Sequence, residues 1–302
     1  MNRAYKYRLY PAKAQKDFFH RTFGCCRKVW NLMLADKKDA YEKTGRFPIL
    51  TPAMYKDEYP FLREVDSLAL SNVQLALQRA IQDAYKVKGR GFPKFRSKKK
   101  ARQSYTTNNL NGTIRVLEKA IRLPKVGFVK AKIHRRAPKG WKLKSATVSM
   151  ETDGAFYVST LYEYDETVVP AAHPESNAIG IDYKSNGLGL LSNGTVIGSP
   201  DALSKKEKRL AREQKKLSRK QGARKGEAKS NNFLKQQRKV GMVYRSIANA
   251  RKDHLHKESL SITKTYDLVG IEDLDMRAMA NKGFHNGKAT MNNAYSMFAR
   301  FL

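Results

Sequence analysis

Two acidic residues stand out because each ends a short apolar run. Asp182 follows the run in AIGIDY, and Glu272 follows the run in YDLVGIEDL. Short runs of this kind, rich in β-branched residues, are typical of strands. If the two strands are neighbours, both carboxylates project from the same end of one sheet. Carboxylate oxygens suit Mg²⁺ or Mn²⁺, and a pair of such ions can activate water and stabilise the leaving oxygen in phosphodiester cleavage.

Each acid taken singly has a simpler explanation. Asp182 would cap a strand end, and Glu272 would form an ion pair with one of the many Lys or Arg residues. Burying a carboxylate destabilises the folded protein by several kcal/mol unless its charge is compensated, and a divalent cation compensates it. Together, in this strand order, the two acids favour a shared metal site over two unrelated structural roles.

The chain is strongly basic. It has 302 residues, 41% of them hydrophobic, with 60 Lys and Arg against 27 Asp and Glu and a formal net charge of +33. A surplus of this size repels itself unless a polyanion neutralises it, so nucleic acid is the expected partner. The sequence has no apolar run of about 18 residues and no signal-peptide core, so we expect no membrane and a cytoplasmic, nucleoid-associated protein.

Only two cysteines occur, Cys25 and Cys26. Adjacent cysteines neither form an ordinary disulfide framework nor match the paired C-x-x-C spacing of a zinc ribbon. We therefore expect structural thiols in a reducing compartment and no zinc site in this chain.

The amino-terminal half predicts a β module that is interrupted by helices. RAYKYRLYP alternates like a strand, helical spacing runs from Lys13 to about Tyr41, and a second helix begins near Ser67, the expected N-cap. Short strand-like runs follow. The prediction is a small barrel or sandwich formed by residues 1–12 and 91–170, with a helical insertion at residues 13–90.

The second half, residues 177–302, predicts an α/β domain. Its first strand is followed by a hairpin that turns at SNG, then by two long basic helices at about residues 202–220 and 233–264, and then by the strand that carries Glu272. This order predicts a mixed sheet, with the two basic helices lying over the side of the sheet that carries the acids. The fold class of the whole chain is therefore α+β multidomain.

Several segments together resemble one protein family. IGIDYKSNGLGLLSNG, KKEKRLAREQKKLSRK, NNFLKQQRKVGMVYRSIANARKDHLHKES and VGIEDLDMRAMA resemble the RuvC-like nuclease domain of TnpB proteins. These are RNA-guided endonucleases of insertion sequences, related to compact type V CRISPR effectors. YKYRLYP, FGCCRKVWN and GFPKFRSKKKARQSYTT are similar to the wedge and recognition segments of the same family.

The resemblance covers essentially the whole chain and carries several expectations. It implies a wedge-type β-barrel with a helical recognition insertion, followed by an RNase H-like (RuvC) α/β domain. It makes Asp182 the first and Glu272 the second acid of a site that uses Mg²⁺ (or Mn²⁺). It also implies a guide RNA and a double-stranded DNA target, cut next to a short adjacent motif.

The sequence departs from the family after Glu272. The family continues with a four-cysteine zinc segment and a third catalytic Asp, whereas this chain ends at NNAYSMFARFL. Asp273 and Asp275 are poor substitutes, because Asp273 points to the opposite face of the strand and Asp275 lies beyond its end. The alternatives to a nuclease are therefore a nuclease-dead, guide-directed DNA-binding repressor and a truncated inactive copy. The acid pair argues against a third alternative, an RNA-binding protein without a DNA target.

Nucleic acid is expected to bind along basic segments that also carry aromatic rings, because these offer both phosphate contacts and stacking faces. GRGFPKFRSKKKARQSY is the first choice, and Arg27 and Asn31, beside Trp30, are expected to read the short DNA motif. A solvated charged face, or a helix packed on its core, is the alternative at each place. The candidate residues are Lys6, Arg8, Arg27, Asn31, Lys94, Phe95, Arg96, Lys98, Tyr105, Lys216, Arg219, Lys235 and Arg238.

Overall fold

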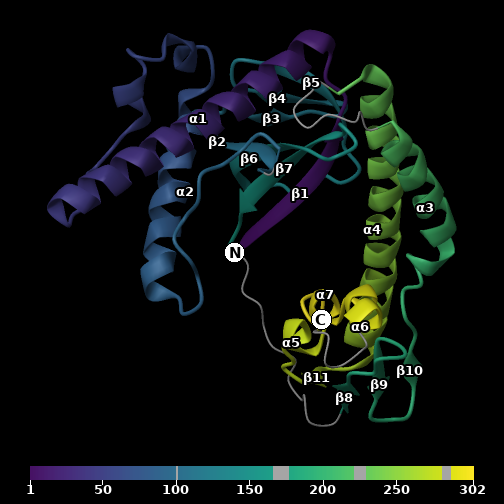
Figure 1. The fold of residues 1–302 in the computed structure, drawn as a ribbon. Coiled ribbons are helices and arrows are strands. Elements are labelled where there is room, and N and C mark those ends of the chain that lie inside the picture. Colours follow the sequence, from purple (N-terminus) through teal and green to yellow (C-terminus); the bar gives the residue numbers. More distant parts are fainter. Residues whose placement is uncertain (100, 166–176, 221–228, 281–286) are drawn as a thin grey trace. The chain divides into compact units, whose positions relative to one another are not determined.

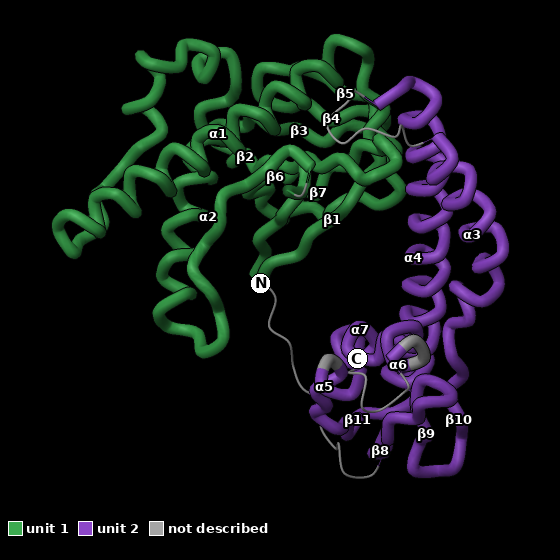
Figure 2. The backbone as a smooth tube through the Cα atoms, viewed as in Figure 1, with its two compact units in different colours: residues 1–166 green, residues 167–302 purple. Residues whose placement is uncertain are grey.

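The chain divides into two compact units, Met1–Glu166 and Thr167–Leu302 (Figure 2). The computed structural model describes residues 1–99, 101–165, 177–220, 229–280 and 287–302. Both units contain helices and strands, which confirms the predicted α+β class. No helix in these ranges is long and apolar enough to cross a bilayer.

The first unit is built on a seven-stranded antiparallel sheet in the order β2-β6-β7-β1-β5-β4-β3 (Figure 1). Its amino-terminal strand lies at the centre, where it pairs with β7 along its whole length. The strands are β1 (Asn2–Leu9), β2 (Gln103–Asn108), β3 (Arg115–Val116), β4 (Ala120–Leu123), β5 (Gly127–Lys132), β6 (Lys142–Met150) and β7 (Phe156–Glu163). β1 follows the predicted alternation, because Tyr5, Tyr7 and Leu9 are buried and Lys6 is exposed.

Two helices pack on this sheet and share its core. α1 (Lys13–Thr44) buries one stripe, including Phe19 and Cys26, and ends at Gly45, whose φ of 67° gives the left-handed C-cap. α2 (Ser67–Lys86) follows two short 3₁₀ turns, η1 (Pro52–Tyr55) and η2 (Pro60–Arg63). The N-cap of α2 is Asp66 and not Ser67 as predicted, because the Asp66 carboxylate accepts a hydrogen bond from Leu68 N at 3.2 Å.

Both cysteines are buried free thiols, as the sequence predicted. Cys26 lies between α1 and the start of α2, with its Sγ 3.9 Å from the carbonyl oxygen of Ala69. Burial raises the pKa of the Cys26 thiol to about 12.

The second unit contains a four-stranded mixed sheet in the order β10-β9-β8-β11. β8 (Ala178–Asp182) pairs in parallel with β11 (Leu268–Ile271), and antiparallel with β9 (Gly189–Leu191). β9 turns through Gly194, whose φ is 84°, into β10 (Val196–Ile197). The sequence predicted this mixed sheet. Along the chain, the β9–β10 hairpin follows β8 and precedes β11, the parallel neighbour of β8.

Two long helices follow the hairpin, α3 (Ser204–Arg219) and α4 (Asn231–Thr265), before three short ones, α5 (Met276–Met279), α6 (Gly287–Asn293) and α7 (Tyr295–Phe298). We expected both long helices to lie over the sheet, and this is wrong for α3 and for the first half of α4. Leu210 of α3 packs on Val243 of α4 in a separate small core, so these parts form a hairpin that projects from the sheet (Figure 1). Only the second half of α4, through Leu255 and Ile262, joins the core of the sheet.

Candidate functional site

Asp182 and Glu272 occupy equivalent positions at the ends of two neighbouring parallel strands. Ile181 of β8 is in register with Ile271 of β11, and each acid is the next residue along its strand. Side chains alternate between faces along a strand, so both acids project opposite to the buried Ile181. The two carboxylates thus share one end and one face of the sheet.

The acids line an open hollow of about 600 Å³ over this face. Gly180 and Gly270 are also in register, each two residues before the acid of its strand and therefore on the same side of the sheet. Gly270 has only backbone atoms near it, whereas the side chain of Ser192 lies against Gly180 and accepts a hydrogen bond from Gly180 N at 3.2 Å. Both acids are exposed. The prediction that these carboxylates are buried is therefore wrong, because the core lies on the opposite face of the sheet. The other lining residues are Ile181, Leu190, Leu191, Ser192, Gly194 and Ile271.

The two acids have no partner among the described residues. Within the described ranges, the Asp182 and Glu272 carboxylates make no hydrogen bond or ion pair, although the chain has 60 Lys and Arg residues. Strands in a sheet lie about 4.8 Å apart, so two like charges stand side by side and repel each other. The ion pair that would explain Glu272 without a metal is therefore absent from the part of the chain that the structure describes.

Among the described residues, no third His, Cys, Asp or Glu side chain joins the two carboxylates to complete a metal-binding group. Asp275 has another role, since its Oδ1 accepts a hydrogen bond from Ala278 N at 3.2 Å at the start of α5. Asp273 does not line the hollow. Two carboxylates offer hard oxygen donors, which fit Mg²⁺ or Mn²⁺ with the remaining positions left to water and phosphate oxygens.

Tyr295, which the sequence analysis missed, is buried in the core of the second unit with Ile179 and Ile181. Burial raises the pKa of its phenol, and the negative charges of Glu272 and Asp182 raise it further. Its ring meets that of Tyr183 edge-on, with 5.2 Å between the ring centroids. Tyr295 belongs to a four-residue helix without a recognisable motif, so no pattern in the sequence pointed to it.

The loops around the acids are tied to the helices by buried polar contacts. Asn293 Nδ2 donates to the carbonyl oxygen of Ser185 at 2.9 Å, and Asn293 Oδ1 accepts from Ser199 Oγ at 3.0 Å. His254 Nε2 of α4 lies 2.9 Å from the carbonyl oxygen of Gly198. These contacts fix the segments that follow β8 and β10.

In the first unit, α1 holds the basic segment at residues 92–99 by direct bonds to its backbone. Trp30 Nε1 donates to Lys94 O at 3.1 Å. Asn31 Oδ1 accepts from Arg96 N at 2.8 Å, and Asn31 Nδ2 donates to Arg96 O at 3.0 Å. The Arg96 guanidinium lies 3.3 Å from the centre of the Trp30 ring. The oxygen and the nitrogen of the Asn31 side-chain amide both bond to the backbone of Arg96, so Asn31 is not free to read a DNA motif as we predicted. Arg27, the other residue of that prediction, is half-buried on the same helix.

The two aromatic residues that we expected to stack on bases differ in exposure. The Phe95 ring is 56% exposed, with Lys38 Nζ 5.3 Å from its centre, whereas Tyr105 is only 5% exposed within the core. Tyr105 offers no stacking face, because the alternation of β2 turns its ring inward, and that prediction is corrected. Lys94 and Lys98 are exposed beside Phe95.

The central strand of the first sheet presents the remaining two candidates of that unit. Lys6 Nζ pairs with Glu151 at 3.0 Å and lies 4.5 Å from the centre of the Tyr157 ring. The Arg8 guanidinium lies 5.6 Å from the Tyr10 ring and 5.0 Å from the Tyr157 ring. Cations held over aromatic rings form a surface suited to single-stranded nucleic acid.

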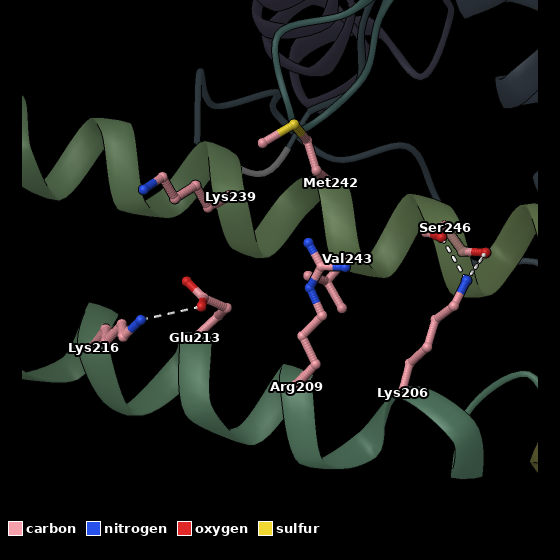
Figure 3. A pocket seen from close by; sticks show the side chains of 8 residues that line it. All are labelled: Lys206, Arg209, Glu213, Lys216, Lys239, Met242, Val243 and Ser246. Atoms are coloured by element: carbon pink, nitrogen blue, oxygen red, sulfur yellow. Dashed lines mark hydrogen bonds and ion pairs between the residues drawn. The ribbon is translucent and has the colours of Figure 1, made fainter.

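The hairpin of α3 and α4 carries the other candidates, Lys216, Arg219, Lys235 and Arg238, all of them exposed. A hollow of about 420 Å³ lies between the two helices, and Figure 3 shows the side chains that line it. Lys206 Nζ donates to the backbone and hydroxyl oxygens of Ser246, while Arg209 points from α3 toward Val243 (Figure 3). Glu213, the one acid among the lining residues, is 3.4 Å from Lys216, so the hollow as a whole is positive.

The sequence and the fold were compared with those of known proteins. Residues 1–46 match a family described as "Helix-turn-helix domain", and residues 159–283 match the IS605 OrfB family, described as "Probable transposase". A protein of Streptomyces pristinaespiralis named "Putative RNA-guided DNA endonuclease" is 33% identical over 295 residues, which are 94% of this chain and 69% of the relative. The chain belongs to the TnpB (IS605 OrfB) family.

A second TnpB relative supports this membership. The Escherichia coli K12 protein named "Putative RNA-guided DNA endonuclease InsQ" is 31% identical over 285 residues, covering 92% of this chain and 67% of the relative. The present TnpB chain therefore spans about two thirds of the length of both relatives. Its residues 1–46 form one strand and one continuous helix, β1 and α1, rather than a helix-turn-helix.

The TnpB fold found here is similar to that of a Cas12f1 chain, solved by cryo-electron microscopy in a complex with sgRNA and target DNA. The TM-score is 0.54 at 11% sequence identity, over 96% of this chain and 72% of that chain. At so low an identity, the likeness supports the mixed α+β fold alone.

Proposed function

We propose that this TnpB chain binds a guide RNA, is directed by it to double-stranded DNA next to a short adjacent motif, and cleaves that DNA at a metal site formed by Asp182 and Glu272. The observation that carries the proposal is the acid pair: two carboxylates at neighbouring strand ends, with no partner among the described residues, in a chain with a net charge of +33. The names of the two relatives support the RNA-guided activity.

The proposed domain organisation is the one that the family resemblance implies. Residues 1–12 and 91–170 form the wedge barrel, residues 13–90 the recognition insertion, and residues 177–302 the RuvC-like domain. Base pairing with the guide reads the target sequence, so the protein has to hold the duplex mainly by its phosphates. Exposed cations beside Phe95 and on the α3–α4 hairpin supply such contacts.

The acid pair would hold Mg²⁺ (or Mn²⁺) through oxygens of Asp182 and Glu272. When bound, such an ion polarises a phosphoryl oxygen and makes a bound water a better nucleophile. The hollow at the acids is open, and Gly270 in its lining adds no side chain between the carboxylates and an approaching phosphate. The exposed acids also leave room for the water molecules that Mg²⁺ retains.

The proposal is tested with the complete chain, expressed together with the DNA that flanks its gene. We expect a structured RNA to copurify, and sequencing that RNA defines the target to be offered with Mg²⁺. Asp182→Asn and Glu272→Gln should retain the RNA and the target and lose cleavage. Asp273→Asn, which removes the same charge one residue away and outside the hollow, is the matched control.

Three outcomes separate the alternatives. Cleavage by wild type that disappears in both acid variants supports the nuclease. Specific target binding without any cleavage by wild type identifies a guide-directed DNA-binding protein that acts as a repressor. A chain that copurifies with no RNA contradicts the whole proposal.

A further inference from the structure

A second hollow, of about 350 Å³, lies within the first unit between α2 and the segment 47–50 that follows α1. Its volume is in the range of about 300–1,000 Å³ that is typical of small-ligand sites. Among the described residues no carboxylate lines it, so nothing there repels an anionic ligand. The lining residues are Lys37, Phe47, Pro48, Ile49, Leu50, Gln74, Gln78, Ile81 and Gln82.

Three glutamines of α2 supply the polar part of this lining. Gln74, Gln78 and Gln82 are spaced four residues apart, so their side chains follow one another along one side of the helix. None of the three amides has a hydrogen-bond partner within the part of the chain that the structure describes. Each amide offers a donor and an acceptor side by side, which is the pattern that pairs with the edge of a nucleobase.

The segment 47–50 supplies most of the apolar part, and its position is fixed by contacts with α1. The Phe47 ring stacks on that of Tyr41, with 4.6 Å between the ring centroids and 16° between the ring planes. Lys37 Nζ donates to the carbonyl oxygen of Pro48 at 2.6 Å. Ile49 is 90% exposed, although it is fully apolar. Apolar side chains next to a row of amides suit a planar heterocycle, because its faces are apolar and its edge is polar.

Aromatic contacts connect this hollow with the basic segment 92–99. The ring of Phe47, which lines the hollow, lies 6.2 Å from that of Phe92, centroid to centroid. Lys38 Nζ lies 5.7 Å from the centre of the Phe92 ring and 5.3 Å from that of the exposed Phe95 ring. A nucleic-acid strand whose phosphates lie along the lysines of this segment therefore passes beside the hollow.

We propose that the hollow binds one unstacked base of the guide RNA, with the edge of the base on the glutamine amides and its face on the segment 47–50. This inference rests on the proposed function, because it requires a bound RNA. RNA is favoured over the DNA target because specific contacts to RNA are made in loops whose bases are splayed out, whereas the bases of a DNA duplex are stacked inside it. The hollow recognises a base, whereas the nearby lysines hold phosphates.

The test uses the RNA that copurifies with the complete chain and measures its binding to RNA-free protein by filter binding at several salt concentrations. Gln78→Ala removes one amide, and we expect the Kd to rise about tenfold. The slope of log K against log salt should not change, because no phosphate contact is lost. The melting temperature should not fall, because alanine is a good helix former. Leu75→Ala, exposed on α2 and outside the lining, is the matched control and should bind as wild type does.

Ultraviolet crosslinking of the complex, followed by trypsin digestion and mass spectrometry, locates the base. Trypsin cleavage after Arg46 and Lys56 releases residues 47–56 as one peptide, and an RNA nucleotide on this peptide supports the proposal. A peptide that carries no nucleotide refutes it. A crosslink to target DNA alone would assign the hollow to DNA and overturn the inference.

The remaining outcomes show which proposal fails if one does. If RNA copurifies but Gln78→Ala binds it as wild type does, the base site is refuted and the proposed function stands. If no RNA copurifies, both are refuted. A smaller salt slope in Gln78→Ala would identify a phosphate contact in place of a base contact. A dimer in solution that Ile49→Asp dissociates would show that a second copy of the chain covers the hollow, and would also overturn the inference.

Discussion

The side chain of Asn31 pairs with the backbone of Arg96 as a neighbouring strand would. Its Oδ1 accepts from Arg96 N at 2.8 Å and its Nδ2 donates to Arg96 O at 3.0 Å. Together with the bond from Trp30 Nε1 to Lys94 O, this contact fixes the basic segment 92–99 along α1. The residue that we expected to read DNA instead holds in place the segment that carries Phe95 and its lysines.

Replacing Asn31 should release this segment. Asn31→Ala removes both bonds to Arg96, and we expect a loss of about 1–3 kcal/mol in the free energy of unfolding, together with rapid tryptic cleavage within residues 92–99. Limited proteolysis followed by mass spectrometry measures the cleavage. Glu42→Ala, at an exposed position of the same helix, should leave both properties unchanged. Cleavage as slow as in wild type would show that Asn31 does not fix the segment.

Phe95 and Tyr105 should separate RNA binding from stability. Phe95→Ala removes an exposed ring, so it should weaken RNA binding by about 1–3 kcal/mol, the value of one stacked base, without lowering the melting temperature. Tyr105→Ala leaves a cavity in the core and should cost about 3–5 kcal/mol of stability. Filter binding of the copurified RNA and thermal unfolding distinguish the two, and equal effects of both variants on the melting temperature would contradict the assignment.

The register of the acid pair was predictable because the two strands share a pattern. AIGID and LVGIE place glycine two residues and isoleucine one residue before the acid, so parallel pairing brings the carboxylates together. What the sequence could not give was the face: either strand face can be buried, and only the packing of Ile179 and Ile181 on the helices decides it.

Other features were missed for local reasons. β2 is a polar run, QSYTTN, whose role as a strand comes from its pairing with β6 rather than from apolar alternation. The N-cap of α2 was shifted by one residue because Asp66 and Ser67 are both good caps and only the bond to Leu68 N distinguishes them. Asn31 acts through its bonds to Arg96, which lies 65 residues further along the chain, and no local pattern records such a contact.

Neutralising one acid should stabilise the metal-free protein. Asp182 and Glu272 repel each other on adjacent strands, so Asp182→Asn should raise the melting temperature in EDTA by about 2 °C. The same variant should lose the stabilisation that Mg²⁺ gives to wild type. Differential scanning fluorimetry with and without Mg²⁺ measures both effects, with Asp273→Asn as the control. A lower melting temperature in EDTA would mean that Asp182 has a stabilising partner.

The stability of the first unit should fall in alkaline solution because of Cys26. Its pKa is raised from 9.0 to about 12 in the folded state, so below pH 9 the thiol is neutral in both states and has no effect. Between pH 9 and 12 only the unfolded state loses the proton, which lowers the free energy of unfolding by about 1.4 kcal/mol per pH unit. From pH 8 to pH 10, urea unfolding of wild type should therefore show about 1.4 kcal/mol more loss than that of Cys26→Ala. An equal loss in both proteins would assign the pH dependence to other groups.

The α3–α4 hairpin should contribute to RNA binding through its charge alone. Arg219→Ala combined with Lys235→Ala should reduce the slope of log K against log salt by about 1.5, as expected for two lost phosphate contacts. Lys257→Ala is the control, because the Lys257 charge is already offset by Asp253, 2.7 Å away. An unchanged slope in the double variant would show that the hairpin stays clear of the nucleic acid.

One continuous helix belongs to both small cores of the second unit. α4 is 35 residues long, or about 52 Å, and it passes from the hairpin core at Val240 to the sheet core at Leu255. Its His254 also holds the segment after β10 through the carbonyl oxygen of Gly198. A polyanion bound at the outer end of α4 would therefore contact the same rigid helix that packs under the sheet carrying Asp182 and Glu272.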